Sequence, residues 1–114
     1  ACVQWAGITA LHQAASEVAS MVSLFDERRR VLIRGLRKLG FSIKHEPNGA
    51  FYIFVNAKHL GADSLKLAMD ILEKVQLGVA PGIDFGANGE GYLRFSYASS
   101  VENIEEALGR LKRY

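Results

Sequence analysis

The amino-acid sequence predicts a two-layer α+β sandwich, in which helices pack on a mostly antiparallel four-stranded sheet. Two observations favour this class. Segments whose apolar residues recur every three or four positions alternate with short strand-like runs, in the order helix, strand, strand, helix, strand, strand, helix. The chain has 114 residues, which suits one domain, so we expect residues 1–114 to share a single core.

The first third of the chain is expected to be helical, as one long helix over about residues 8–39 or as a pair of helices. Its apolar residues follow helical spacing. They are Ile8, Leu11, Ala15, Val18, Val22, Phe25, Leu32, Leu36 and Leu39. Gly40 follows this stripe and is expected to end the helix in the left-handed conformation.

Two strands are expected next, joined by a turn at residues 46–49. Residues 41–45 alternate apolar and polar side chains, which is typical of a half-exposed strand. Residues 50–55 are almost wholly apolar and aromatic. We therefore expect them to form a central strand that is covered on both faces.

A second helix is expected with Asp63 or Ser64 as its N-cap. The apolar spacing places three residues on its inner face, namely Leu65, Met69 and Leu72. Residues 75–80 form the third expected strand, which Pro81 and Gly82 end.

The fourth expected strand covers residues 92–97, and its period of two places Tyr92, Arg94 and Ser96 on one face. A final helix follows, with Ser99 and Glu102 at capping-box spacing. Its apolar stripe consists of Ile104, Leu108 and Leu111.

Composition excludes several classes of function. The net charge of +2 is too small to indicate nucleic acid or an anionic membrane as a partner. The single cysteine, Cys2, excludes an internal disulfide and a cysteine zinc site, and it suits a reducing compartment, so we expect a cytoplasmic protein. The three histidines have no partner at metal-ligand spacing, and no metal residue is expected. The chain starts without methionine or a signal pattern, so we expect it to be a piece of a longer protein.

Arg94 is the main candidate for a binding residue. It lies in a strand-like run directly after a glycine-rich loop, residues 81–91. The planar fork of a guanidinium matches the two oxygens of a carboxylate, so this arrangement suits a carboxylate clamp. Taken alone, the loop is most simply a long hairpin connection, and an arginine in such a strand is more often a solvent-facing residue than a clamp.

Three sequence pieces occur in register around this arginine. They are Pro47-Asn48-Gly49-Ala50-Phe51-Tyr52, then Val79-Ala80-Pro81-Gly82-Ile83-Asp84-Phe85-Gly86, then Gly91-Tyr92-Leu93-Arg94-Phe95-Ser96. Together they resemble the C-terminal small domain of the class I/II, fold-type-I aminotransferases, the aspartate aminotransferase superfamily. The resemblance runs over nearly the whole chain.

The resemblance implies a division of roles. Arg94 matches the family arginine that binds the substrate α-carboxylate, and Phe51 matches an aromatic residue that lines the substrate pocket. The cofactor, pyridoxal 5'-phosphate, is implied for the full-length enzyme but is not expected on this chain. None of the six lysines has the family's serine-x-x-lysine context, so no catalytic or cofactor-binding residue is expected here and the isolated chain should be inactive.

The resemblance further implies a homodimer that transfers an amino group between an amino acid and a 2-oxo acid. Val3, Trp5, Ile8 and Leu11 are then expected to be covered partly by the protein's own N-terminal large domain. Two alternatives stay open. The chain is either a stand-alone α+β module that binds a small molecule or regulates, or a part of a lyase of the same superfamily.

Overall fold

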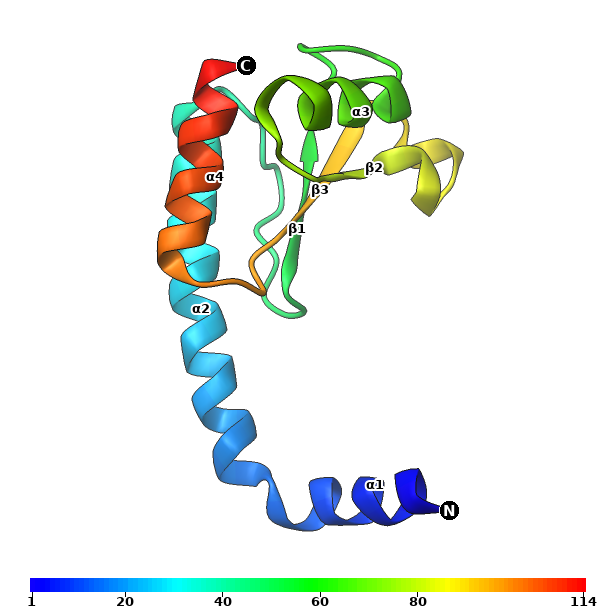
Figure 1. Ribbon diagram of the computed structural model, residues 1–114, viewed down its shortest axis with the longest axis vertical. Helices are drawn as coiled ribbons and strands as arrows, with labels where there is room; N and C mark the ends of the chain where they lie inside the picture. The colour runs from blue at the N-terminus through cyan, green and yellow to red at the C-terminus, as the bar shows by residue number, and fades with distance from the viewer.

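A computed structural model describes all residues, 1–114, and it confirms the α+β class (Figure 1). Three α-helices pack on one side of a small sheet, and a fourth, the N-terminal one, stands apart from it. The elements in chain order are α1 (Cys2–Gln13), α2 (Ala15–Lys38), β1 (Tyr52–Asn56), α3 (Ser64–Val75), β2 (Ala80–Pro81), the 3₁₀ turns η1 (Gly82–Phe85) and η2 (Ala87–Gly89), β3 (Tyr92–Ser96) and α4 (Val101–Arg113). In Figure 1, α2 and α4 lie side by side, and α3 stands beside β2 at the other end of the sheet.

The sheet has three antiparallel strands in the order β1-β3-β2, so the expected four-stranded sheet was wrong, and the strand that is missing is the one expected over residues 41–45. Residues 41–45 make only one isolated bridge, between Ser42 and Asn56. Phe41 and Ile43 of this segment are buried in the core. The alternation of apolar and polar residues over 41–45 therefore belongs to a loop whose apolar side chains are buried in the core. Such a loop does not need a ladder of backbone hydrogen bonds.

The expected place of residues 50–55 in the sheet was also wrong, because β1 is an edge strand and β3 is central. In β1 only Ile53 and Val55 are buried, while Tyr52 and Phe54 on the other face are 37% and 38% exposed. All the helices that pack on the sheet lie on its buried face. The other face carries Tyr52, Phe54, Asn56, Tyr92, Arg94 and Ser96, and is called the open face below.

The third strand is shorter than expected, since only Ala80 and Pro81 pair with β3. Helix α3 continues to Val75, and Gln76 then adopts a left-handed conformation with φ 54°. Residues 76–79 therefore lie outside the sheet, and Ala80, opposite Arg94, is the first residue of this segment that pairs with β3.

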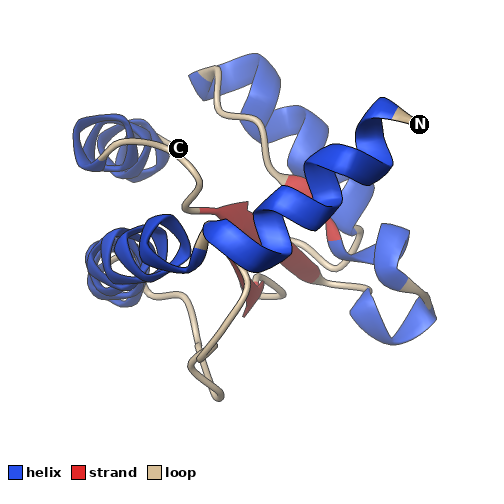
Figure 2. Ribbon diagram, turned by 90° about the horizontal axis from the view of Figure 1, so that it is seen from below, coloured by secondary structure: helices blue, strands red, loops and turns tan.

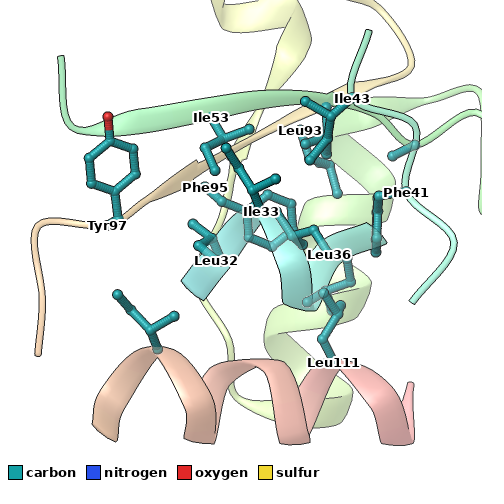
Figure 3. Packing of buried hydrophobic residues seen from close by; sticks show 14 of the residues in the cluster. Leu32, Ile33, Leu36, Phe41, Ile43, Ile53, Leu93, Phe95, Tyr97 and Leu111 are labelled. Carbon is teal, nitrogen blue, oxygen red and sulfur yellow. The ribbon is translucent and has the colours of Figure 1, made fainter. Parts of the chain in front are cut away.

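The core lies between the buried face of the sheet and the helices (Figure 3). Leu32, Ile33 and Leu36 of α2 fill its centre, and Leu111 of α4 closes one side. Tyr97 is 1% exposed, and its hydroxyl donates to the carbonyl oxygens of Gly49 and Ala50 at 3.2 and 3.1 Å. That contact ties the turn before β1 to the end of β3.

Two helix details differ from expectation. Asp63 caps α3 as expected, but its buried face holds Leu67, Ala68 and Ile71 while Leu65, Met69 and Leu72 are exposed. The helix carries two apolar stripes, and spacing alone does not distinguish them. The cap of α4 is Ser100, whose hydroxyl accepts from the Asn103 backbone at 3.2 Å, and Ser99 accepts from the Asn103 side chain instead.

The helical segment expected over residues 8–39 is present as two helices that meet at Ala14, where the chain turns sharply (Figure 1). Gly40 has the expected positive φ, 90°. Figure 1 shows α1 standing apart from the rest of the molecule, and in Figure 2, which is seen from below, α1 crosses in front of the sheet. No residue of α1 is buried, and Leu11 and Val3 are 88% and 79% exposed.

These exposed residues lead to a prediction for the isolated chain. We expect the 114-residue chain to fold cooperatively, because its core is continuous, and to self-associate through α1, whose exposed residues include Val3, Trp5, Ile8 and Leu11. Sedimentation over a range of concentrations measures this. A Trp5→Gln, Leu11→Gln variant should associate less and melt at the same temperature. A wild-type chain that stays monomeric at high concentration contradicts the prediction.

Candidate functional site

Arg94 lies at the middle of β3, on the open face, opposite Phe54 of β1 and Ala80 of β2. Its side chain is half-buried between two aromatic rings. The guanidinium carbon lies 4.8 Å from the centroid of the Phe85 ring and 5.2 Å from that of the Tyr52 ring. Both rings therefore contact the cation at distances typical of cation–π interactions.

The N–H groups of Arg94 make no hydrogen bond or ion pair with the rest of the chain. Asp84 is exposed on η1, and the Glu90 carboxylate is occupied elsewhere. The guanidinium is thus held by ring contacts while its hydrogen-bond donors stay available. An anion with two oxygens, such as a carboxylate, matches those donors.

The glycine-rich loop folds compactly because its backbone packs against itself. A Cβ atom on Gly82 would overlap the carbonyl oxygen of Gly89 and lie 2.7 Å from that of Tyr92. The loop is also tied to the start of α3. The Ile83 backbone N–H donates to the Ser64 hydroxyl at 3.1 Å, and Ser64 is fully buried. These contacts set the position of Phe85, which ends η1.

Glu90 anchors the other end of this loop. Its Oε1 accepts from the backbone N–H groups of Ser64 at 2.6 Å and Gly91 at 3.0 Å. The hydrogen bonds from Ser64, above all from its backbone, lower the pKa of the Glu90 carboxyl below its ordinary value, and Gly91 adds to this effect. Folding therefore favours the ionised carboxylate.

This pKa shift predicts a pH-dependent contribution to stability. The contribution is fully present above the unfolded-state pKa of about 4.3 and is lost as the pH falls through the lower folded-state pKa of Glu90. At pH 7, Glu90→Gln should lower the urea midpoint of the chain, and the difference from wild type should shrink in acid. Glu73→Gln is a matched control, because Glu73 is exposed and makes no ion pair. A difference that is constant from neutral to acid pH contradicts the prediction.

Phe51 lies just before β1 and is 47% exposed. Its ring packs edge-on against Tyr52, with centroids 5.6 Å apart, so it reaches Arg94 only through Tyr52. The two expected site residues, Arg94 and Phe51, therefore belong to one aromatic cluster, in which each packs on Tyr52.

Sequence reasoning missed Tyr52 and Phe85 as partners of Arg94. If the strand at residues 50–55 is paired with the strand at residues 92–97, Tyr52 and Phe54 fall on the same face of the sheet as Arg94. The apolar and aromatic character of residues 50–55 instead predicted a core position for these side chains. A hollow of about 420 Å³ lies beside this cluster. Its lining includes Tyr52, Phe54, Tyr92, Lys44 and His45 but not Arg94, so Arg94 lies beside this hollow and not in its wall.

Comparison with known proteins identifies the family. The model of the family described as aminotransferase class I and II matches residues 1–111. The chain therefore belongs to the class I and II aminotransferases. The match is consistent with the C-terminal small domain that the sequence motifs resemble.

Individual relatives agree. An aspartate aminotransferase of Pyrococcus horikoshii is 42% identical over 114 residues, covering 97% of this chain and 29% of the relative. The putative aminotransferase YugH of Bacillus subtilis is 39% identical over 114 residues, covering 100% of this chain and 29% of that protein. The chain thus spans less than a third of the length of these relatives.

Solved structures are similar in fold. An aromatic aminotransferase of P. horikoshii gives a TM-score of 0.84 at 36% identity, covering 90% of this chain and 27% of that one. A variant of the aspartate aminotransferase of Thermus thermophilus complexed with tryptophan gives 0.85 at 34% identity, covering 96% and 28%. No helix of this chain is both long enough and apolar enough to cross a membrane.

The family implies pyridoxal phosphate, which such enzymes hold covalently on a lysine. All six lysines of this chain are exposed, and Lys44 and Lys66 are among those that line open hollows. None follows a serine at serine-x-x-lysine spacing, so no lysine here fits the covalent site. Lys58 lies over the Tyr92 ring, and Lys74 pairs with Asp70. No cluster of acidic, histidine or cysteine side chains is arranged to hold a metal ion. Arg94 is the one feature described here that suits a substrate group.

Proposed function

We propose that this chain is the substrate-carboxylate-binding small domain of a pyridoxal-phosphate-dependent aminotransferase. Its full-length protein transfers an amino group between an amino acid and a 2-oxo acid. The observation that carries the proposal is Arg94, whose guanidinium is held between two rings while its N–H groups remain unpaired. Family membership supports the reaction class.

In this proposal the chain supplies binding and orientation. Pyridoxal phosphate, when bound by the full-length protein, supplies the electron sink for chemistry at the amino-acid Cα. Two N–H groups of Arg94 donate hydrogen bonds to the α-carboxylate and so set which Cα bond faces the reacting centre. Such positioning matters strongly, because a small misplacement can reduce the rate about 100-fold. Phe51 lines the pocket from the edge of Tyr52.

The open face suits a lid. Its aromatic side chains are exposed in this chain, although residues of this kind are usually covered. We infer that they face the large domain across the substrate, so that movement of the small domain towards it excludes water from the reaction. The exposed apolar side chains of α1 pack on the same large domain or on the second subunit of a homodimer, and the enzyme acts in the cytoplasm.

The test is an activity assay on the full-length protein with pyridoxal phosphate. We expect an amino acid and a 2-oxo acid to be converted into the complementary pair, without release of ammonia or carbon dioxide. Release of either product in stoichiometric amount indicates a lyase of the same superfamily. Absence of any reaction with amino acids, together with saturable binding of a small carboxylate, indicates a binding or regulatory module.

A further inference from the structure

The contacts of Arg94 point to two residues with a positioning role. We propose that Phe85 and Tyr52 form a ring clamp that fixes the Arg94 guanidinium for the substrate carboxylate. The name ring clamp refers to these two residues only. The inference rests on the proposed function of Arg94, and it goes beyond it by assigning roles to two further side chains.

The clamp solves a problem of geometry. An arginine side chain has several rotatable bonds, and on an exposed sheet face it would sample many positions before it meets a carboxylate. A cation over two ring faces is held in place without the use of its N–H donors. Hydrogen bonds to Asp84 or Glu90 would also hold it, but they would occupy the donors that a carboxylate needs.

Both rings are themselves fixed by aromatic neighbours. Phe85 packs edge-on against Phe54 at 5.8 Å between centroids, and Phe54 stacks on Tyr92 at 5.1 Å with an interplanar angle of 9°. Tyr52 packs edge-on against Phe51 at 5.6 Å. The two members of the clamp therefore belong to two separate groups of rings, which meet at the Arg94 guanidinium, and rings packed in this way restrain one another.

The two members of the clamp come from separate parts of the chain. Tyr52 lies on β1, whereas Phe85 ends η1 in the glycine-rich loop. Phe85 reaches Arg94 only while η1 is folded, and the bond from Ile83 to the buried Ser64 hydroxyl holds η1 against α3. The loop thereby contributes to carboxylate binding through Phe85, although it supplies no hydrogen bond to the substrate in this proposal.

The test uses three variants of the full-length protein. Phe85→Leu removes the ring but keeps an apolar side chain of similar size. Phe85→Tyr restores a ring. Ile83→Ala is the matched control, because Ile83 is on the same turn, is 38% exposed, and bonds to Ser64 through its backbone N–H, which alanine retains. Since Phe85 is itself 51% exposed, none of these changes opens the core.

Two kinds of ligand separate positioning from a general structural effect. The first carries the α-carboxylate: aspartate or phenylalanine as substrate, whichever the protein prefers, and the matching desamino acid, succinate or 3-phenylpropanoate, for equilibrium binding. The second lacks the α-carboxylate: β-alanine or phenethylamine in the half-reaction. We expect Phe85→Leu to raise the KM and the desamino-acid Kd about 10-fold, as loss of a desolvated cation–π contact implies. The kcat should change less, and the rate with the amine should not change.

Phe85→Tyr should recover most of the wild-type affinity, and Ile83→Ala should equal wild type. In an Arg94→Ala background, Phe85→Leu should have no further effect on carboxylate binding. The inference is overturned if Phe85→Leu slows the amine and the amino acid equally, or if it leaves both unchanged while Arg94→Ala impairs the amino acid. If Arg94→Ala itself has wild-type kinetics, the proposed function of Arg94 fails instead, which is a distinct outcome.

Discussion

Arg94→Ala in the full-length protein is expected to weaken binding of the amino-acid α-carboxylate by about 2–5 kcal/mol, the range for removing one partner of a buried charge pair. The fold and the uptake of the cofactor should not change. Arg94 makes no hydrogen bond or ion pair within the chain, and its half-buried side chain contributes only ring contacts. The measurement is kcat/KM with the preferred amino acid, together with the thermal melting temperature.

Arg94→Lys should recover only part of this loss. An ammonium keeps the charge but cannot donate two parallel hydrogen bonds to a carboxylate. Arg30→Ala serves as a matched control for loss of a cation, because Arg30 is exposed on α2 and pairs only with Asp26. Unchanged kcat/KM in the Arg94→Ala enzyme would show that the α-carboxylate is bound elsewhere.

Gly82→Ala is expected to destabilise the 114-residue chain by about 2–3 kcal/mol, at the upper end of the range for overpacking. The added Cβ would overlap a backbone carbonyl oxygen, that of Gly89, and backbone cannot move aside as easily as a flexible side chain. The two turns would have to separate, and Phe85 would leave Arg94. Urea unfolding followed by circular dichroism measures the change in free energy.

Gly78→Ala is the control for this substitution. Gly78 has open space around its missing Cβ and no positive φ, so alanine should be neutral there or slightly stabilising. If Gly82→Ala were as stable as Gly78→Ala, the close packing of Gly82 against Gly89 would not be a feature of the folded chain in solution.

Elements with one apolar stripe were predictable from the sequence. In α4, the stripe of Ile104, Leu108 and Leu111 does pack inwards, with Ile104 and Leu111 buried. Spacing is informative there because every apolar position falls on one side. In α3 apolar residues occupy two sides, and only the placement of the sheet decides that Ile71 is buried and Met69 is exposed.

The strands show a second limit. Aromatic content in β1 was interpreted as burial on both faces, yet Tyr52 and Phe54 lie on the open face. A hydrophobic side chain indicates that contacts stabilise it, but its identity does not show whether those contacts come from the same domain, from another domain or from another subunit. The 114 residues span 29% of the P. horikoshii relative, and under the proposed function the large domain covers the open face.

The sequence predicted the central residue of the candidate site, Arg94, but not the two aromatic rings that contact it. Arg94 lies in a strand and follows a glycine-rich loop. The sequence motif therefore identifies it as a candidate binding residue, and the two-residue period of the strand identifies the face on which it lies. Phe85 is not part of any strand, so strand pairing does not predict its contact with Arg94. It reaches Arg94 because it ends the 3₁₀ turn η1, which brings its ring against the guanidinium. The path of an irregular loop follows from contacts such as Ile83 to Ser64, which no short sequence pattern encodes.

The junction at Ala14 has a mechanical consequence. Helix α2 is continuous from Ala15 to Lys38, and its second half carries Leu32, Ile33 and Leu36 of the core. It is therefore a stiff lever fixed to the body of the domain, with Ala14 as the one residue between it and α1. At about 1.5 Å per residue the lever is about 36 Å long, so a rotation of about 10° at Ala14 carries its far end through about 6 Å. A small change in two backbone angles would thus displace the whole sheet, and Arg94 with it, by more than the length of a carboxylate hydrogen bond.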